Sequence, residues 1–157
     1  MWKLLIAFLL AIFPLSCVAY AHQSGSATMK RLAFMRGSWN CTVHDGQSNG
    51  LVQRTTYSFS SDGLWMTELS YDVGSKNDWE TQMWGYDAHA KKLVAYQFTA
   101  DGVYTKTVTG FIGKNFMSTR NDNGATVSLV PITSNSIDWV IASADHSYVV
   151  KEHCVRR

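Results

Sequence analysis

The chain from Ser38 onward alternates short apolar runs with polar clusters. The runs are rich in Thr, Val, Tyr, Trp and Phe, and clusters of Asp, Asn, Gly and Ser separate them roughly every eight to twelve residues. This pattern is typical of strands joined by tight turns, because the clusters hold the residues that turns require. Nine clusters follow the first run and predict ten strands, at residues 38–44, 51–59, 64–72, 79–87, 92–100, 103–113, 115–121, 125–132, 137–143 and 147–155.

One short helix is predicted ahead of the strands. Residues 29–35 carry an apolar face, Thr28 is a candidate N-cap, and Gly37 ends the helix. Residues 22–28 are small and polar, and we expect them to form a flexible segment. No stretch after residue 37 is long and periodic enough to predict a second helix.

Residues 1–21 have the features of a secretory signal peptide. Lys3 supplies a positive charge, an apolar run follows at residues 4–15, and cleavage is expected after Ala21. An uncleaved anchor is disfavoured, because roughly 20 apolar residues are needed to span a bilayer. We therefore expect a secreted or periplasmic protein.

The alternative to cleavage after Ala21 is that the segment is the signal of a lipoprotein. Its modified cysteine would be Cys17, but Pro14 stands where a leucine is expected. Cleavage after Ala21 would leave 136 of the 157 residues, enough for one domain, which we place at residues 29–157.

The charge of the chain is small and scattered. Removing Lys3 lowers the basic residues from 14 to 13, against 12 acidic ones. Nucleic acid is therefore not an expected partner. No basic amphipathic helix is present in the sequence, so membrane insertion of the mature chain is not expected either. The oligomeric state is left open.

Two cysteines remain after cleavage, Cys41 in the first predicted strand and Cys154 in the last. Because an exported compartment is oxidising, we predict a disulfide between them. Two separate buried thiols are the alternative, since free cysteines also pack as small apolar groups.

A disulfide would decide between the architectures that ten consecutive strands allow. Bridged cysteines need Cα atoms within about 7 Å, whereas the first and last strands of an open ten-stranded sheet lie some 40 Å apart at about 4.8 Å per strand. In a closed meander those strands are neighbours. The prediction is an all-β fold, a single up-and-down antiparallel barrel of about ten strands preceded by a short helix. A two-sheet sandwich with adjacent ends stays open as the alternative.

A short helix followed by Gly37-Ser38-Trp39 at the start of an antiparallel barrel resembles the calycin group, which includes lipocalins, fatty-acid-binding proteins and nitrobindin-like proteins. In lipocalins this tryptophan closes the barrel floor and packs against a basic side chain from a late strand. The resemblance implies that Arg156 or Arg157 packs on Trp39 here.

A second stretch, residues 83–87 (MWGYD) followed by a turn and residues 93–96 (LVAY), is similar to a signature of an uncharacterised family of bacterial secreted or cytosolic calycin-like domains. The predicted ten strands exceed the eight of lipocalins. The resemblance therefore bears on the fold more than on a ligand.

Alternation along each strand sorts side chains into an inner and an outer face. The faces that we expect to point inward are rich in aromatic residues and carry a few amides and hydroxyls. A lining of this kind favours a small, largely apolar ligand. The alternative is that these aromatic side chains fill a solid core. The candidate ligand-binding residues are Gln53, Tyr57, Trp84, Tyr86, Tyr96 and Phe98.

Glu68 is the candidate catalytic residue, although the strand pattern leaves its direction open. Pointing inward, it would be a desolvated carboxyl with a raised pKa and a possible general base. An enzyme of this kind, an isomerase, cyclase or hydrolase, would pair Glu68 with Tyr86 or Tyr96. Pointing outward, Glu68 would be a solvated surface residue.

No cofactor or metal is expected from the sequence. None of the five histidines stands at a metal-ligand spacing within one element. The nitrobindin-like resemblance implies haem as an alternative, held by a late histidine, for which only His146 and His153 are available.

The leading functional hypothesis is thus a secreted or periplasmic barrel that binds a small, largely apolar molecule. An enzyme on the same scaffold is the first alternative. An envelope interaction protein with a solid, packed barrel is the second.

Overall fold

The computed structural model describes residues 25–45, 49–75, 78–112, 115–120 and 124–157. A 3-10 helix, Ala33–Met35, precedes ten strands. The strands are β1 (Gly37–His44), β2 (Val52–Phe59), β3 (Trp65–Asp72), β4 (Trp79–Asp87), β5 (Lys92–Thr99), β6 (Tyr104–Ile112), β7 (Asn115–Arg120), β8 (Thr126–Thr133), β9 (Ser136–Ala142) and β10 (Val149–Arg156).

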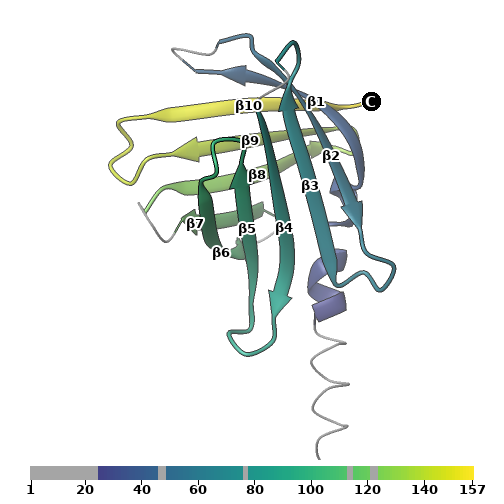
Figure 1. The fold of residues 1–157 in the computed structure, drawn as a ribbon. Helices are drawn as coiled ribbons and strands as arrows, with labels where there is room; N and C mark the ends of the chain where they lie inside the picture. Colours follow the sequence, from purple (N-terminus) through teal and green to yellow (C-terminus); the bar gives the residue numbers. More distant parts are fainter. Residues whose placement is uncertain (1–24, 46–48, 76–77, 113–114, 121–123) are drawn as a thin grey trace, which may run out of the picture.

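The strands form one closed antiparallel barrel. Each strand pairs with its neighbours in sequence, and β1 pairs with both β2 and β10, which leaves no unpaired edge (Figure 1). The predicted strands are confirmed, with every boundary within two residues of its expected position. The up-and-down barrel is confirmed, and the sandwich alternative is wrong.

A disulfide crosses the seam between the first and last strands. Cys41 and Cys154 are paired directly in the β1–β10 ladder, their Cα atoms lie 3.9 Å apart, and their sulfur atoms are bonded. The predicted disulfide is therefore confirmed, and the two free thiols are excluded. Because the cysteines are 113 residues apart, the bridge stabilises the fold by about 4 to 5 kcal/mol in the chain-entropy model.

The helix before β1 begins earlier than predicted. Residues 25–30 are already helical, although 25–28 were expected to be flexible. Packing explains the difference, because Gly25 lies against Leu64 and Tyr86, and Met29 is completely buried. Contacts with the barrel thus fix residues whose own composition gives no helix signal. The predicted signal peptide and residues 22–24 lie outside the described residues.

This helical segment closes one end of the barrel, beside the β2–β3 and β4–β5 hairpins (Figure 1). We call this end the floor and define it by four side chains with at most 1% of their surface exposed: Met29, Leu32, Met35 and Trp39. The Trp39 indole Nε1 donates a hydrogen bond of 2.7 Å to the carbonyl oxygen of Met35. The indole therefore joins the first strand to the 3-10 helix.

Arg156 completes the floor, as the resemblance to lipocalins implies. Its guanidinium carbon lies 4.3 Å from the centre of the Trp39 ring, and its nitrogens donate to the carbonyl oxygens of Phe34 and Arg36. Gly37 has a φ of +115°, and a Cβ there would lie 2.9 Å from the Arg156 guanidinium. The motif thus needs glycine both for its backbone conformation and for the space that Arg156 occupies.

Among the described residues, no helix is long and apolar enough to cross a membrane.

Candidate functional site

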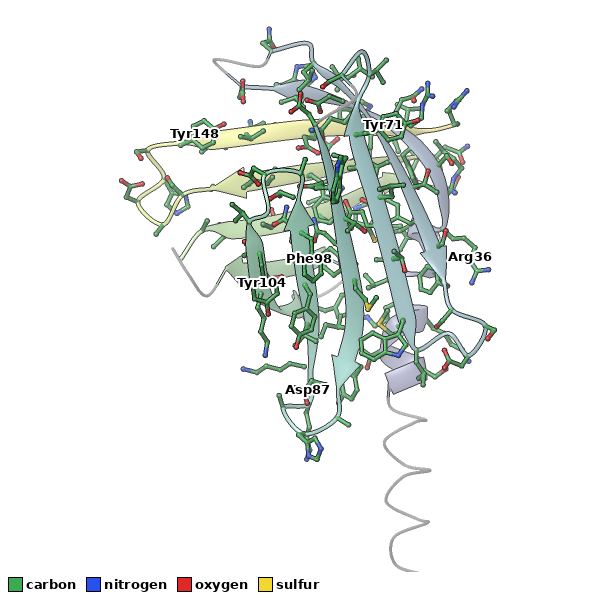
Figure 2. All side chains as sticks on the ribbon, viewed as in Figure 1. Arg36, Tyr71, Asp87, Phe98, Tyr104 and Tyr148 are labelled. Carbon is green, nitrogen blue, oxygen red and sulfur yellow. A yellow bond between two sulfur atoms is a disulfide. The ribbon has the colours of Figure 1, made fainter. Side chains whose placement is uncertain are left out.

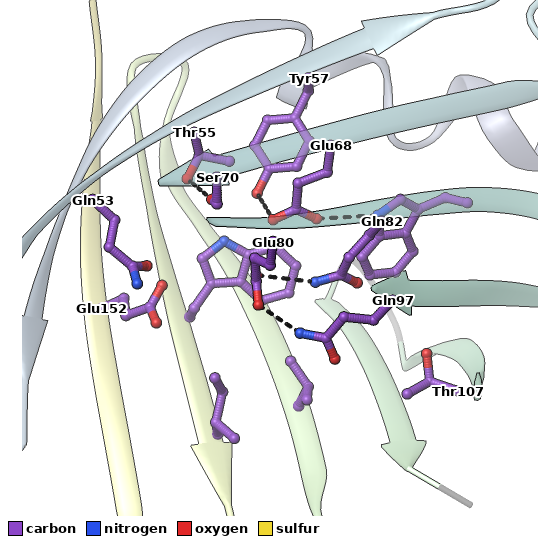
Figure 3. A pocket seen from close by; sticks show the side chains of 14 residues that line it. Gln53, Thr55, Tyr57, Glu68, Ser70, Glu80, Gln82, Gln97, Thr107 and Glu152 are labelled. Carbon is purple, nitrogen blue, oxygen red and sulfur yellow. Dashed lines mark hydrogen bonds between the residues drawn. The ribbon is translucent and has the colours of Figure 1, made fainter. Parts of the chain in front are cut away.

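The barrel interior above the floor holds a cavity of about 110 Å³, here called the inner cavity. Ten of its fourteen lining side chains are polar, and they converge from several strands (Figure 3). The lining residues are Gln53, Thr55, Tyr57, Glu68, Ser70, Glu80, Gln82, Trp84, Gln97, Thr107, Val127, Trp139, Ile141 and Glu152.

Glu68 of β3 points into the inner cavity and is 5% exposed. The Tyr57 hydroxyl donates to its Oε1 at 3.3 Å, and the Trp84 indole Nε1 donates to its Oε2 at 3.1 Å. Both donors favour the charged carboxylate, but burial outweighs them and, together with the Glu80 carboxylate, raises the pKa of Glu68 from 4.5 to about 8. Glu68 is therefore largely protonated at neutral pH.

Two further carboxyl groups line the same cavity. Glu80 of β4 accepts hydrogen bonds from the side-chain amides of Gln97, at 2.6 Å, and of Gln82, at 3.4 Å (Figure 3). Glu152 of β10 accepts no hydrogen bond from any residue that the structure describes. Burial, followed by repulsion from Glu80 and Asp72, raises the pKa of Glu152 to about 7.

A wider cavity of about 420 Å³, the mouth cavity, lies at the end of the barrel opposite the floor. Turn residues after β3 and β5 contribute to it, among them Asp78 and Asp101. Glu80 lines both cavities, as do Gln53, Ser70 and Gln97. The inner cavity is therefore adjacent to the mouth cavity, and these four polar residues border both.

Three of the six predicted ligand-binding residues line the inner cavity, namely Gln53, Tyr57 and Trp84. Tyr86 does not line it and instead packs against the apolar core beside the floor. Glu68 faces inward, so the direction that the sequence left open is settled. The tyrosine that reaches Glu68 is Tyr57. Tyr86 and Tyr96, which were expected as its partners, do not line the inner cavity.

The prediction that Tyr96 and Phe98 line the lumen is corrected, because both lie on the outer face of β5. Phe98 is 44% exposed and lies 5.5 Å from Tyr104, measured between ring centres (Figure 2). Tyr96 stacks on the same Tyr104 at 6.2 Å, and the Lys106 ammonium lies 5.6 Å from its ring centre. The aromatic side chains of β5 therefore lie on the outer face of the barrel.

Pairing with β4 explains the face that β5 turns inward. Residues opposite one another in an antiparallel ladder project on the same side, and Trp84 is paired with Ala95 while Gln82 is paired with Gln97. The bulky indole of Trp84 thus faces a small neighbour, and Gln97 reaches Glu80. Alternation within β5 alone favoured the aromatic face and could not detect this constraint.

The interior is also more polar than the aromatic lumen that the sequence predicted. Among the lining residues that the sequence analysis missed are Glu80, Gln97, Trp139 and Glu152. For two of them a signal exists: Glu80 lies two residues before inward-facing Gln82, and Glu152 lies two residues before Cys154. Extending the period of two along each strand would have placed both carboxyl groups inside.

The two candidate histidines lie away from the cavities. His153 Nδ1 lies 2.6 Å from Asp138 Oδ1 on the outer face of β10, and His146 lies in the turn between β9 and β10. Within the described part of the chain, one group has three metal-ligand atoms close together: Cys41, Glu152 and Cys154. The disulfide occupies both of its sulfur atoms, so the group is not a metal site.

Comparisons with family models and with curated proteins give no match. Among solved structures, the chain is similar to a redesigned beta barrel, with 7% sequence identity, a TM-score of 0.47, and coverage of 80% of this chain and 93% of that one. This likeness is too low to support an argument. The barrel rests on the strand pairing described above, and membership of the calycin group stays a prediction.

Proposed function

We propose that the protein is an exported calycin-like barrel that binds a small, hydrogen-bonding molecule in its lumen. The observation that carries this proposal is the inner cavity, whose polar groups converge on a space inside the barrel that borders the mouth cavity. Binding sites for small molecules combine such enclosure with a few oriented polar groups.

The polar lining changes the class of ligand from the one expected. A largely apolar molecule would leave the carboxyl and amide groups around the cavity without partners, which costs free energy for each group. The indoles of Trp84 and Trp139, which pack together with their ring centres 6.4 Å apart, form an apolar surface in the cavity wall on which a small apolar part of the ligand can pack. The ligand class that fits is therefore small and polar, with at most a short hydrocarbon portion.

Two observations support the rest of the proposal. The Cys41–Cys154 disulfide is of the kind that persists in secreted and periplasmic proteins, in agreement with the predicted signal peptide. A polar cavity also favours a binding role over a packed interaction protein, since a solid barrel would fill the same space with apolar side chains.

The experiment is native mass spectrometry on protein exported by its own host and purified without detergent. The expected result is an added mass on the native protein that denaturation releases. A native protein with no added mass would contradict a tightly held lumen ligand.

A pair of variants locates the bound molecule. Ser70→Met places a longer side chain in the inner cavity, whereas Thr67→Met places a methionine on the exposed face of the same strand. We expect the added mass to disappear in the first variant and to persist in the second, with far-UV circular dichroism showing that both are folded. Persistence in both would place the ligand outside the lumen and contradict the proposal.

Acid–base catalysis is the second candidate, because Glu68 is a buried carboxyl with a pKa raised to about 8 and it faces the cavity. Such a group can give and take a proton near neutral pH. Once a ligand is known, Glu68→Gln tests the point. An enzyme requires that this variant still bind the ligand but no longer convert it, whereas a binding protein shows no conversion by either form.

A further inference from the structure

We infer that the ligand of the lumen is a small organic cation, with an ammonium group held among Glu68, Glu80 and Glu152 and a short chain directed toward the mouth. This inference rests on the proposed function and names its ligand class. It depends on the charges, the open hydrogen-bonding positions and the aromatic surfaces of the two cavities.

The charged groups lining the cavities are all acidic within the described part of the chain. Glu68, Glu80 and Glu152 line the inner cavity, and the mouth cavity adds three aspartates; no lysine, arginine or histidine is among the lining residues. The mouth aspartates are Asp72, Asp78 and Asp101. An entering cation thus meets carboxyl groups along the whole path, which attracts cations and repels anions.

Glu80 is the central group of this arrangement. It lines both cavities, and its negative charge is one cause of the raised pKa values of both Glu68 and Glu152. A positive charge beside Glu80 would remove this repulsion and allow the neighbouring carboxyl groups to ionise. The repulsion among these carboxyl groups is therefore of a kind that a cation specifically relieves.

One hydroxyl group at the mouth is available to a ligand. Thr105 of β6 is 7% exposed and lines the mouth cavity, and its side chain has no hydrogen-bond partner among the described residues. The hydroxyl group is not sealed from solvent, so it is available for a hydrogen bond to a molecule in the mouth cavity. A ligand reaching from Glu80 toward the mouth would supply this partner.

The two indoles provide the remaining recognition. Trp84 and Trp139 both line the inner cavity, and their rings are inclined by 35°. The face of an indole attracts an ammonium group by about 0.5 to 2 kcal/mol, and it packs equally well on the methylene groups attached to it. Carboxylates and indoles together thus favour an alkylammonium over a neutral molecule of the same shape.

One arginine enters the test because of its register in the barrel. The β6–β7 ladder pairs Arg120 with Thr107, which lines the inner cavity. An Arg120→Gln variant therefore belongs in the test, because an internal countercharge would make the ligand's charge unnecessary.

The test compares three probes of similar shape and different charge: butylammonium, 1-butanol and butyrate. Titrations of the full mature protein are followed through the indole N–H signals in nitrogen–proton NMR spectra, with Trp84→Phe and Trp139→Phe used to assign the two signals. We expect butylammonium to shift both signals at concentrations at least about tenfold lower than those needed for 1-butanol, and butyrate to shift neither.

Each other outcome has a distinct meaning. Preferential binding of 1-butanol or butyrate would overturn the cationic ligand and leave the proposed lumen binding intact. No shift with any of the three probes would count against both. Binding of butylammonium only after Arg120→Gln would show that the chain neutralises its own carboxylates, and would overturn the inference.

A matched pair of variants separates the local carboxylate from the net charge. Glu80→Gln keeps an acceptor for the Gln97 amide and removes the central negative charge, so we expect butylammonium affinity to fall about tenfold or more while 1-butanol binding is unchanged. Asp138→Asn removes the same charge from the outer face, where we expect a change below about twofold. Equal effects in the two variants would overturn the inference.

Discussion

The two halves of the barrel interior are built for different purposes. At the floor, Met29, Leu32, Met35 and Trp39 are essentially unexposed and packed into one apolar cluster. Toward the mouth, strands β3, β4 and β10 present three carboxyl groups around a cavity. The floor gains free energy by excluding water, whereas the mouth half gives up part of that gain to keep polar groups oriented around a space.

The seam strands show the change within a few residues. Successive inward-facing pairs of β1 and β10 are Trp39–Arg156, Cys41–Cys154 and Val43–Glu152. The first closes the floor, the second is the disulfide, and the third places a carboxyl in the cavity. The division between a stabilising half and a binding half therefore lies near the disulfide.

Removing one tryptophan from each half is the strongest way to test this division. Trp39→Ala should lower the free energy of unfolding by about 3 to 5 kcal/mol, because it opens a void in a closely packed cluster and removes the surface on which Arg156 packs. Trp139→Ala should cost less, about 1 to 3 kcal/mol, since Trp139 borders a polar cavity that water can enter.

Urea denaturation of both variants measures the difference, and Phe98→Ala on the outer face serves as the control for aromatic truncation. Equal losses for Trp39 and Trp139 would show that the mouth half is packed as tightly as the floor, contrary to the division.

The pH dependence of stability should come from the mouth half. Glu68 has a folded-state pKa of about 8 against an ordinary value of 4.5, so folding favours its protonated form. This contribution is complete below about pH 4.5 and is lost as the pH rises through 8. We expect the free energy of unfolding to fall by about 2 to 4 kcal/mol between pH 5 and pH 9, and Glu68→Gln to remove most of that slope.

The measurement is urea denaturation at several pH values. A smaller slope should persist in Glu68→Gln, because Glu152 loses its proton through about pH 7. Asp145→Asn is the control, since hydrogen bonds from Ser143 and Ser147 lower the pKa of Asp145 to about 2, far from this range. An unchanged alkaline slope in Glu68→Gln would contradict the burial of that carboxyl.

The sequence was sufficient for the strands and the barrel because both depend on local signals. Polar clusters mark the turns, and one pair of cysteines, Cys41 and Cys154, joins the ends of the meander. The floor was also predictable, since Gly37, Trp39 and Arg156 form a recognisable motif.

The site was only partly predictable because it depends on relations between strands. Whether Tyr96 or Gln97 faces inward is decided by the β4 residues opposite them, and each strand read alone favours its more aromatic face. The cavity itself depends on the summed volumes of side chains from most of the strands. No single segment of the sequence reveals that total volume.

The smallest effect on stability is expected for Arg156, whose guanidinium group holds the floor. Arg156→Lys keeps the charge but cannot reproduce the planar pair of donors to the carbonyl oxygens of Phe34 and Arg36, so we expect a loss of about 1 to 2 kcal/mol. Hydrogen exchange at the backbone amides of Met35 and Arg36, which close the 3-10 helix, should report the loss before global unfolding does.

Arg157→Lys is the matched control, because it makes the same substitution one residue later, where the side chain is exposed and the backbone amide donates to the Ser38 carbonyl oxygen. If the floor is held by side-chain geometry, exchange should accelerate in Arg156→Lys alone. If both variants or neither accelerate it, the helix is held by the apolar contacts of Met29, Leu32 and Met35. The arginine over Trp39 would then contribute charge that lysine supplies equally well.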